Sequence, residues 1–301
     1  ACVALLVLVG GATSTARAQA PPVVTRAQVQ KAIAEIDKLT DATLASTGVP
    51  GIAVAVVYRN EVVFIQGYGV REAGKPGAID ADTVFQLASV SKPISSTVLA
   101  VLVGQGVIDW DDRVIDHDPG FRLYDAASTR ELRLRDLLCH RSSLPDHCGD
   151  LLEDMGYDRT TILHRLRYQP PASSFRTAYA YTNFGYTEAA LCGAKAVGQT
   201  WEDVAQEKLY GPLGMTSTSS RFADYENAAN RALLHVKVDG KWTPKYTRLP
   251  DAQAPAGGVS STLNDLTRWM RVSLDEGSFE GKQLVDADAL AETHSPQIVT
   301  N

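Results

Sequence analysis

The spacing of apolar residues predicts a helix followed by a β-hairpin near the start of the chain. Apolar residues recur at three- and four-residue steps over residues 26–46, which is the helical period, and Gly48 and Pro50 end the pattern. Two runs rich in β-branched residues follow at 51–58 and 62–69, separated by a short polar turn. We therefore expect a surface helix and then an antiparallel hairpin.

A nearly continuous apolar segment predicts a buried helix over residues 93–106. Pro93 limits where this helix can begin, because a proline ring clashes with the carbonyl group four residues back unless it lies in the first turn. The helix must therefore begin close to Ser89. Its unpaired N–H groups and the positive end of its dipole would then face Ser89 and favour negative charge developing there.

The middle of the chain alternates short helical patterns with loops rich in proline and glycine. This alternation predicts a helical subdomain over about residues 107–250. Farther along, residues 255–259 predict the entry to a strand, and residues 261–274 predict an amphipathic helix. The short helices of the middle part are predicted at residues 132–140, 161–168, 187–197 and 201–209.

Composition narrows the classes of function. The 301 residues carry a formal net charge of -6, and 45% of them are hydrophobic, which is typical of a globular protein. This charge provides no basic surface, so neither nucleic acid nor an anionic membrane surface is an expected partner. A small neutral or zwitterionic molecule, or a peptide, suits the charge better as a substrate.

The first twenty residues predict a signal peptide that lacks its initiator Met and basic n-region. A short apolar run precedes Ala18, after which we expect cleavage, because cleavage after Ala20 would leave Pro21 next to the scissile bond. A lipid anchor at Cys2 is disfavoured because Cys2 precedes the apolar run instead of ending it. We expect an exported protein, periplasmic or secreted, without stable membrane insertion.

Two short motifs suggest nucleophilic catalysis. Ser89-Val90-Ser91-Lys92 places a hydroxyl group and an amine three residues apart, on one face of a helix. Tyr181-Thr182-Asn183 follows about ninety residues later, and on an extended segment Tyr181 and Asn183 would point to the same side.

Proton transfer in this set of residues has two possible schemes. The ordinary pKa of a lysine, ~10.4, must fall by more than ~3 units for Lys92 to be mostly neutral at pH 7. Either Lys92 is the base and Tyr181 relays protons, or Tyr181 is the shuttle, with its phenolate stabilised by nearby cations. The motifs alone leave both schemes open.

Other residue patterns are weaker. Further Tyr-x-Asn copies occur at 58–60, where a hairpin turn explains the asparagine, and at 225–227, where a solvated helix start does. His140 is placed at a helix exit, where a structural role is commoner than a catalytic one. The sequence contains no Gly-x-Ser-x-Gly elbow, His-Glu-x-x-His helix, Walker loop or Cys-x-x-Cys pair.

A group of cysteines and histidines has a spacing that superficially suggests a metal site. Cys139-His140 and His147-Cys148 are separated by a segment that predicts a helix exit and a tight turn. Zinc is therefore disfavoured, and an export address makes a Cys139–Cys148 disulfide the better alternative. The sequence does not decide whether that disulfide forms.

With its motifs in this order, the chain resembles the serine β-lactamase and penicillin-binding protein superfamily, specifically class C β-lactamase-like hydrolases. The resemblance extends from about Thr40 to the end of the chain. The segments that carry it are 85–93, 137–145, 181–186, 211–215 and 255–261.

The resemblance implies an α+β, β-lactamase/transpeptidase-like fold, in which helices flank an antiparallel sheet and a helical subdomain is inserted. It also implies roles for site residues: Ser89 as the acylated nucleophile, Lys92 and Tyr181 as the proton-transfer pair, and Asn183 as a substrate-orienting group. The backbone N–H of Ser89 would supply half of an oxyanion hole. Neither a metal nor an organic cofactor is implied, and we expect a monomer.

The chain departs from the family pattern at two places. Ser143 stands where a glycine is common in the helix-exit turn, and no Lys/His-Thr/Ser-Gly motif occurs downstream of Tyr181. In the family that third motif lies on a strand lining the site. We therefore expect residues 21–301 to be a C-terminally truncated hydrolase domain that lacks its last strands and is inactive as a fragment.

The sequence thus predicts an exported serine hydrolase that forms an acyl-enzyme with an amide, a β-lactam or an ester. The alternative is a non-catalytic ligand-binding or sensor domain on the same fold. Intact Ser89, Lys92 and Tyr181 favour the enzyme, because a binding module has no need of all three.

Overall fold

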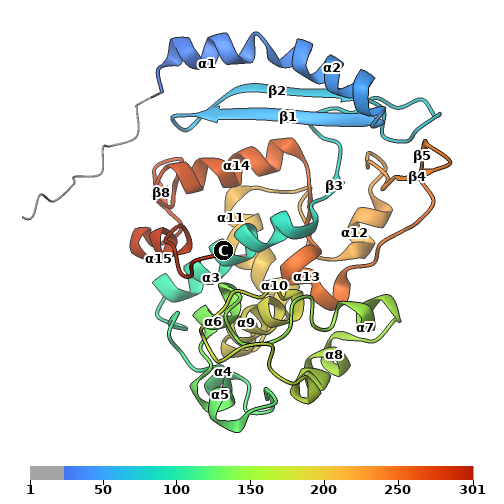
Figure 1. Cartoon of the computed structure of the whole chain (residues 1–301). Coiled ribbons are helices and arrows are strands. Elements are labelled where there is room, and N and C mark those ends of the chain that lie inside the picture. The colour runs from blue at the N-terminus through green and yellow to red at the C-terminus, as the bar shows by residue number, and fades with distance from the viewer. Residues whose placement is uncertain (1–23, 301) are drawn as a thin grey trace, which may run out of the picture.

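The computed structural model of the protein describes residues 24–300 (Figure 1). The signal peptide predicted for residues 1–20 lies outside these residues. Over the described range, no helix has both the length and the apolar character needed to cross a membrane.

An antiparallel hairpin lies between two helical layers (Figure 1). Its strands are β1 (Gly51–Tyr58) and β2 (Glu61–Gly69), paired from Gly51↔Gly69 to Tyr58↔Glu61 with an irregularity after Val56. Helices α1 (Arg26–Ile33) and α2 (Ile36–Thr47) cover one face, and α14 (Leu263–Leu274) packs against the other. The predicted hairpin and its flanking helices are therefore present. In the described part of the chain, no third strand pairs with β1 or β2.

The N-terminal pattern forms two helices, so the single helix predicted over 26–46 is wrong in detail. The N–H of Glu35 bonds to the carbonyl of Ala32, three residues back, at 3.1 Å. This tighter turn interrupts the α-helical hydrogen-bond pattern, and a new α-helix begins at Ile36. The second helix ends as predicted at Gly48, whose φ of 65° is in the left-handed region that favours glycine.

The predicted apolar helix, α3 (Ser91–Gly104), passes through the centre of the helical body (Figure 1). The 3-10 turn η1 (Ala88–Val90) leads directly into it. Pro93 is therefore the third residue of α3, in the first turn, as its ring requires. The helix is buried over most of its length, with Ile94, Val98, Leu99 and Leu102 fully inaccessible to solvent.

Short helices fill the segment that we predicted as a helical subdomain, and they pack around α3. Its status as an inserted subdomain stays a prediction. The elements of this part are α4 (Val114–His117), α5 (Ala126–Glu131), α6 (Leu134–Leu138), α7 (Asp150–Asp154), α8 (Arg159–Arg165), η2 (Leu166–Tyr168), α9 (Asn183–Ala196), α10 (Trp201–Ala205), the π-helical η3 (Gln206–Tyr210), α11 (Gly211–Leu213), α12 (Phe222–Asn227), β4 (Val236–Val238) and β5 (Lys241–Thr243).

Two predictions for this part need correction. The helix expected over 187–197 begins four residues earlier, at Asn183, because the turn after Thr182 is already helical. The Tyr-x-Asn copy at 225–227 ends helix α12 and is not a solvated helix start. Tyr225 is buried, and its hydroxyl group donates to the Ala232 carbonyl at 2.6 Å. This tyrosine therefore has a structural role.

The C-terminal part returns to α3. Residues 255–259, predicted as a strand entry, lie mostly in a short helix, α13, because Gly258 N–H still bonds to the Ala254 carbonyl at 2.9 Å. A two-residue strand follows and pairs with the segment just before Ser89. The remaining elements are β3 (Phe85–Gln86), η4 (Asp251–Gln253), α13 (Ala254–Gly257), β6 (Ser260–Ser261), β7 (Ser278–Phe279), β8 (Lys282–Gln283) and α15 (Ala287–Thr293).

Candidate active site

The exposed Ser89 lies on the turn η1 at the N-terminal end of α3. The preceding residue, Ala88, has a φ of 47°, an uncommon conformation for a residue with a Cβ atom. Two hydrogen bonds to Val259 hold the turn: Leu87 N–H donates to the Val259 carbonyl, and Val259 N–H donates to Ser91 Oγ, both at 2.9 Å. The segment after α13 therefore fixes the backbone that presents the Ser89 hydroxyl group.

The Lys92 amine lies among four oxygen atoms. It donates to Asn183 Oδ1 at 2.7 Å and to the Ala256 carbonyl oxygen at 3.0 Å. It also donates to the Tyr181 hydroxyl group, and Ser89 Oγ lies at 3.4 Å. The Asn183 and Ala256 oxygens can only accept, so they hold two of the amine protons whether Lys92 is charged or neutral.

The protonation of Lys92 is shifted by its surroundings. The residue is only 8% exposed, and this burial lowers the pKa of Lys92 to about 8, against a smaller opposing effect of the Asp150 charge. The aromatic rings of Tyr181 and Tyr186 lie 4.4 Å and 5.7 Å from Nζ. A lysine in this environment can exchange a proton at mildly alkaline pH, which an exposed lysine does not do.

Tyr181 approaches Ser89 from a loop. Its hydroxyl group lies 2.6 Å from Ser89 Oγ, and either atom can be the donor. Its backbone carbonyl accepts from His147 N–H at 2.7 Å. The structure thus places Ser89, Lys92 and Tyr181 in direct mutual contact.

Asn183 reaches the same site by a different geometry from the predicted one. We expected Tyr181 and Asn183 on one side of an extended segment, but Asn183 is the first residue of α9 and is 8% exposed. Its side chain contacts Lys92 through Oδ1 and Asp150 through Nδ2, at 2.7 and 2.9 Å. Both ends of the Asn183 amide are thus bonded within the protein.

His140 supports the loop that carries Tyr181. Burial first, and then the nearby Lys92 charge, lower the pKa of His140 to about 4, so its ring is neutral at pH 7. Its Nδ1 accepts from Thr182 N–H at 3.1 Å, and its carbonyl accepts from Ala180 N–H at 2.8 Å. The ring centroid lies 4.7 Å from that of Tyr181. These contacts give His140 a structural role at the helix exit.

A buried carboxylate, Asp136, joins the two loops on this side of the site. It is inaccessible to solvent and accepts from Arg141 Nε at 2.7 Å and from Arg176 Nη2 at 2.8 Å. These two arginines lie in the loops that carry His140 and Tyr181. Ser143, which replaces the common glycine in the first of these loops, has a φ of 71° and adopts the backbone conformation that glycine favours.

Two residues that contact the site were missed by sequence reasoning. Asp150 Oδ2 accepts from Asn183 and lies 2.8 Å from His147 Nδ1. The tilted ring of His147 lies 5.2 Å from that of Tyr181. The sequence offered His147 as part of a cysteine and histidine group and as a possible base for a serine, but nothing local to residues 146–150 indicates contact with a helix more than thirty residues away.

The cysteine and histidine group forms neither of the arrangements considered. Cys139 and Cys148 are both free thiols, so the Cys139–Cys148 disulfide is absent from the structure. Across residues 24–300, no three His, Cys, Asp or Glu side chains gather where they could hold a metal ion.

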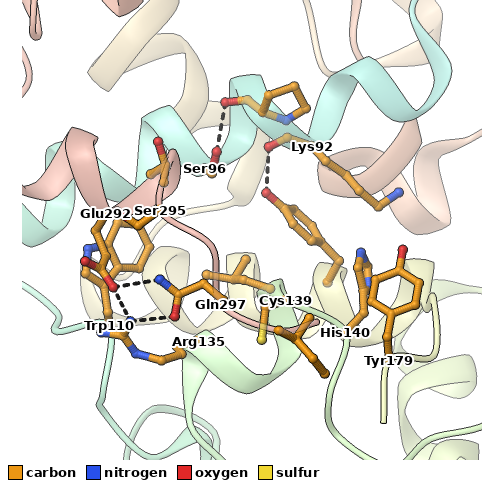
Figure 2. Close-up of a pocket in the computed structure, with 15 residues that line it drawn as sticks. Lys92, Ser96, Trp110, Arg135, Cys139, His140, Tyr179, Glu292, Ser295 and Gln297 are labelled. Atoms are coloured by element: carbon orange, nitrogen blue, oxygen red, sulfur yellow. Dashed lines mark hydrogen bonds and ion pairs between the residues drawn. The ribbon is translucent and has the colours of Figure 1, made fainter. Parts of the chain in front are cut away.

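A cavity of about 390 Å³ lies beside the site (Figure 2). Lys92 and Tyr179 line it where it meets the site, and Arg135, Glu292 and Gln297 line its other end, where they are joined by hydrogen bonds. Ser89 is not among its lining residues. The cavity therefore adjoins Lys92 but does not include Ser89.

Comparison with known proteins indicates the family of the chain. A family model described as "Beta-lactamase" matches residues 36–299. Penicillin-binding protein 4 of Amycolatopsis lactamdurans is 29% identical over 261 residues, which cover 83% of this chain and 66% of that protein. The D-alanyl-D-alanine-carboxypeptidase/endopeptidase AmpH of Escherichia coli K12 is 25% identical over 255 residues, which cover 83% and 64%. The chain thus spans slightly less than two thirds of the length of these relatives.

The fold has a counterpart among solved structures. The octameric penicillin-binding protein homologue from Pyrococcus abyssi superposes with a TM-score of 0.73 at 19% identity, over 86% of this chain and 59% of that one. This likeness confirms the predicted α+β, β-lactamase/transpeptidase-like fold. Fold and family model together define a member of the serine β-lactamase and penicillin-binding protein superfamily. The chain belongs to the β-lactamase family.

Proposed function

We propose that the protein is a serine hydrolase that forms an acyl-enzyme at Ser89, with Lys92 and Tyr181 as the proton-transfer pair. The observation that carries this proposal is the contact of one exposed hydroxyl group with both partners, at 2.6 Å from Tyr181 and 3.4 Å from Lys92. A nucleophile within reach of a base, with that base oriented by further groups, is the arrangement that activates serine.

The contacts of Lys92 suggest the direction of proton transfer. When Lys92 is neutral, Asn183 Oδ1 and the Ala256 carbonyl retain its two protons, and its lone pair faces Tyr181 and Ser89. Ser89 Oγ can then attack a carbonyl carbon while its proton passes to Lys92, directly or through the Tyr181 hydroxyl group. The same proton returns to the leaving group as the carbonyl re-forms. Water completes hydrolysis by the reverse proton path.

The proposed substrates are amides, β-lactams and esters of the class C β-lactamase-like type. The relatives support this range, because one is named as a penicillin-binding protein and another as a D-alanyl peptidase. The mechanism uses no metal and no organic cofactor. We further propose that the protein is exported, periplasmic or secreted, which the leader pattern in residues 1–20 supports. We also propose that it acts as a monomer on small molecules or peptides.

Covalent labelling of the full-length gene product tests this proposal. We expect a fluorescent penicillin or a fluorophosphonate to add one acyl or phosphonyl group, which mass spectrometry places on the peptide that contains Ser89. The Ser89→Ala variant should lose this adduct, while Ser96→Ala, the sixth residue of α3, should keep it. Labelling that survives in Ser89→Ala would refute the nucleophile, and a folded parent that reacts with neither probe would favour a binding or sensor domain.

A further inference from the structure

The direction of the Asn183 amide is fixed by two charged groups of opposite sign. Lys92 Nζ donates to Oδ1 at 2.7 Å, and Nδ2 donates to Asp150 Oδ2 at 2.9 Å. An ammonium group can only donate and a carboxylate can only accept. Rotating the amide by half a turn would therefore oppose donor to donor and acceptor to acceptor. Asp150 thus determines which end of Asn183 faces Lys92.

The position of Asp150 is itself fixed by the backbone. Asp150 begins α7 directly after Gly149, whose φ is 100°, and a Cβ atom on Gly149 would lie 2.7 Å from the ring of Phe184. Only glycine fits this corner. On the other side, the ring Nδ1 of His147 lies 2.8 Å from Asp150 Oδ2. The backbone N–H of His147 donates to the Tyr181 carbonyl. A closed set of contacts therefore connects Asp150 with Tyr181.

Asp150 is the carboxylate whose negative charge influences the protonation of Lys92. The other titratable groups around the amine are Tyr181, Tyr186 and His140, and the last is neutral at pH 7. Among the described lysines and arginines, none forms an ion pair with Asp150, whose contact with a basic side chain is that with His147 Nδ1, at 2.8 Å. The Asp150 charge raises the pKa of Lys92, in opposition to burial.

We propose that Asp150 is a positioning residue of the acylation step, which acts through the Asn183 amide to hold the Lys92 amine toward Tyr181 and Ser89 and provides its counter-charge. This inference rests on the proposed function of Ser89 and Lys92. Asn183 then orients Lys92 in addition to any contact that it makes with substrate. Residues 147–150 then contribute to the position of the proton-transfer pair.

The Asp150→Asn variant removes the charge and keeps the shape of the side chain. Its new amide can both donate and accept, so only Lys92 is left to orient the Asn183 amide, and a neutral Lys92 can accept as well as donate. We expect the plateau of the acylation rate to fall ~10-fold, and the midpoint of its acidic limb to move down by about half a pH unit to one unit, because an opposite charge near Lys92 is lost. Asp150→Glu should restore the midpoint, since it restores the charge.

Asp146→Asn is the matched control. Asp146 lies in the same loop, with Oδ2 3.9 Å from His147 Nε2, and its side chain is 64% exposed. It has no hydrogen bond to Asn183. We expect this variant to keep both the plateau and the midpoint of the parent. An equal effect in Asp146→Asn and Asp150→Asn would show that any negative charge in this loop has the same influence, and would overturn a specific role of Asp150.

A direct titration of Lys92 separates this inference from the proposed function. The lysines are labelled at Cε with carbon-13, and the Lys92 signal is assigned by its loss in Lys92→Arg. We expect the titration midpoint of Lys92 to fall in Asp150→Asn with no substrate present. An unchanged midpoint and an unchanged acylation profile would overturn the inference, even if Ser89 is acylated. A lowered midpoint in a protein that no probe acylates would uphold the Asp150–Lys92 coupling and refute the hydrolase.

A merely structural role of Asp150 predicts a different result. Thermal unfolding would then shift to lower temperature while the Lys92 titration stays in place. If Asp150→Asn does not fold, as judged by circular dichroism, Asp150→Ser removes the same charge with a smaller side chain and is tested in the same two assays.

Discussion

At the scale of single residues, the site depends on an amine whose protonation is set by burial. Lys92 is 8% exposed, and two oxygens that can only accept hold two of its protons. Burial of a lysine destabilises its charged form, which is why the pKa of Lys92 falls to about 8. A residue near a proton-exchange midpoint at mildly alkaline pH is suited to general base catalysis.

The pH dependence of acylation follows from this shift. Because the neutral fraction of Lys92 rises with pH, we expect the acylation rate of Ser89 to rise through a midpoint near pH 8 and then level off. Stopped-flow measurement of the acylation rate with a fluorescent penicillin between pH 6 and 10 tests this pH dependence. Lys92→Arg, which cannot lose its proton in this range, should abolish the rise. A rate that falls above pH 8 would instead favour the scheme in which charged Lys92 stabilises a Tyr181 phenolate.

At the scale of elements, α9 joins the site to the core. It begins at Asn183, beside Lys92, and continues through a fully buried face that includes Glu188 and Cys192. Glu188 accepts from Cys192 Sγ at 3.7 Å, and its other carboxyl oxygen has no hydrogen-bond partner among the described residues. Burial raises the pKa of Glu188 to about 8, from 4.5. The folded protein therefore holds this carboxyl group protonated at neutral pH.

The raised pKa of Glu188 predicts a stability that depends on pH. Its stabilising contribution is fully present below pH 4.5 and is lost as the pH rises through about 8, because the unfolded chain ionises first. Glu188→Gln removes this dependence. Between pH 5 and pH 8, we expect the free energy of unfolding of Glu188→Gln to rise relative to that of the parent by roughly 3 kcal/mol.

Urea denaturation at the two pH values measures this difference. Glu207→Gln is the control, because Glu207 is exposed on η3 and should change little between pH 5 and pH 8. Equal curves for Glu188→Gln and the parent at both pH values would show that Glu188 is ionised in the folded protein.

At the scale of the whole molecule, the main hydrophobic core lies beneath the site, and α14 connects this core to the β1–β2 hairpin. Side chains of α3, α9, η3, α14 and α15 belong to this core. Helix α14 connects to α3 through Trp269 Nε1, which donates to Thr97 Oγ1 at 3.0 Å, and to the hairpin through Asn60, which accepts from Arg271 at 3.0 Å. The helix that directly follows Ser89 is thus also the centre of the fold.

Truncation of a core residue of α3 should therefore destabilise the molecule as a whole. Leu99 is inaccessible to solvent, and we expect Leu99→Ala to lower the free energy of unfolding by about 3 kcal/mol through lost burial and a residual cavity. Leu39→Ala is the control, since Leu39 is 62% exposed on α2, and it should change stability by less than ~0.5 kcal/mol. Urea denaturation compares the two. Similar small losses would show that α3 is not the centre of the core.

The sequence by itself determined the local geometry of this protein and the chemistry of its motifs. The apolar periods predict the hairpin, α3 and α14, because these segments are long and each has a strong pattern. Pro93 sets the start of α3 near Ser89, because a proline ring fits only the first turn of a helix. Ser89, Lys92, Tyr181 and Asn183 could be named in advance, because their residue types and spacing resemble a known family.

Only the tertiary structure decided what surrounds those groups. The start of α9 at Asn183, the carbonyl of Ala256 beside Lys92 and the approach of Asp150 to Asn183 all depend on segments far apart in the sequence. Local patterns report backbone preference, whereas burial and hydrogen bonding depend on which segments meet when the core packs. The shifted pKa of Lys92 is therefore a property of the folded chain and not of the Ser-x-x-Lys motif.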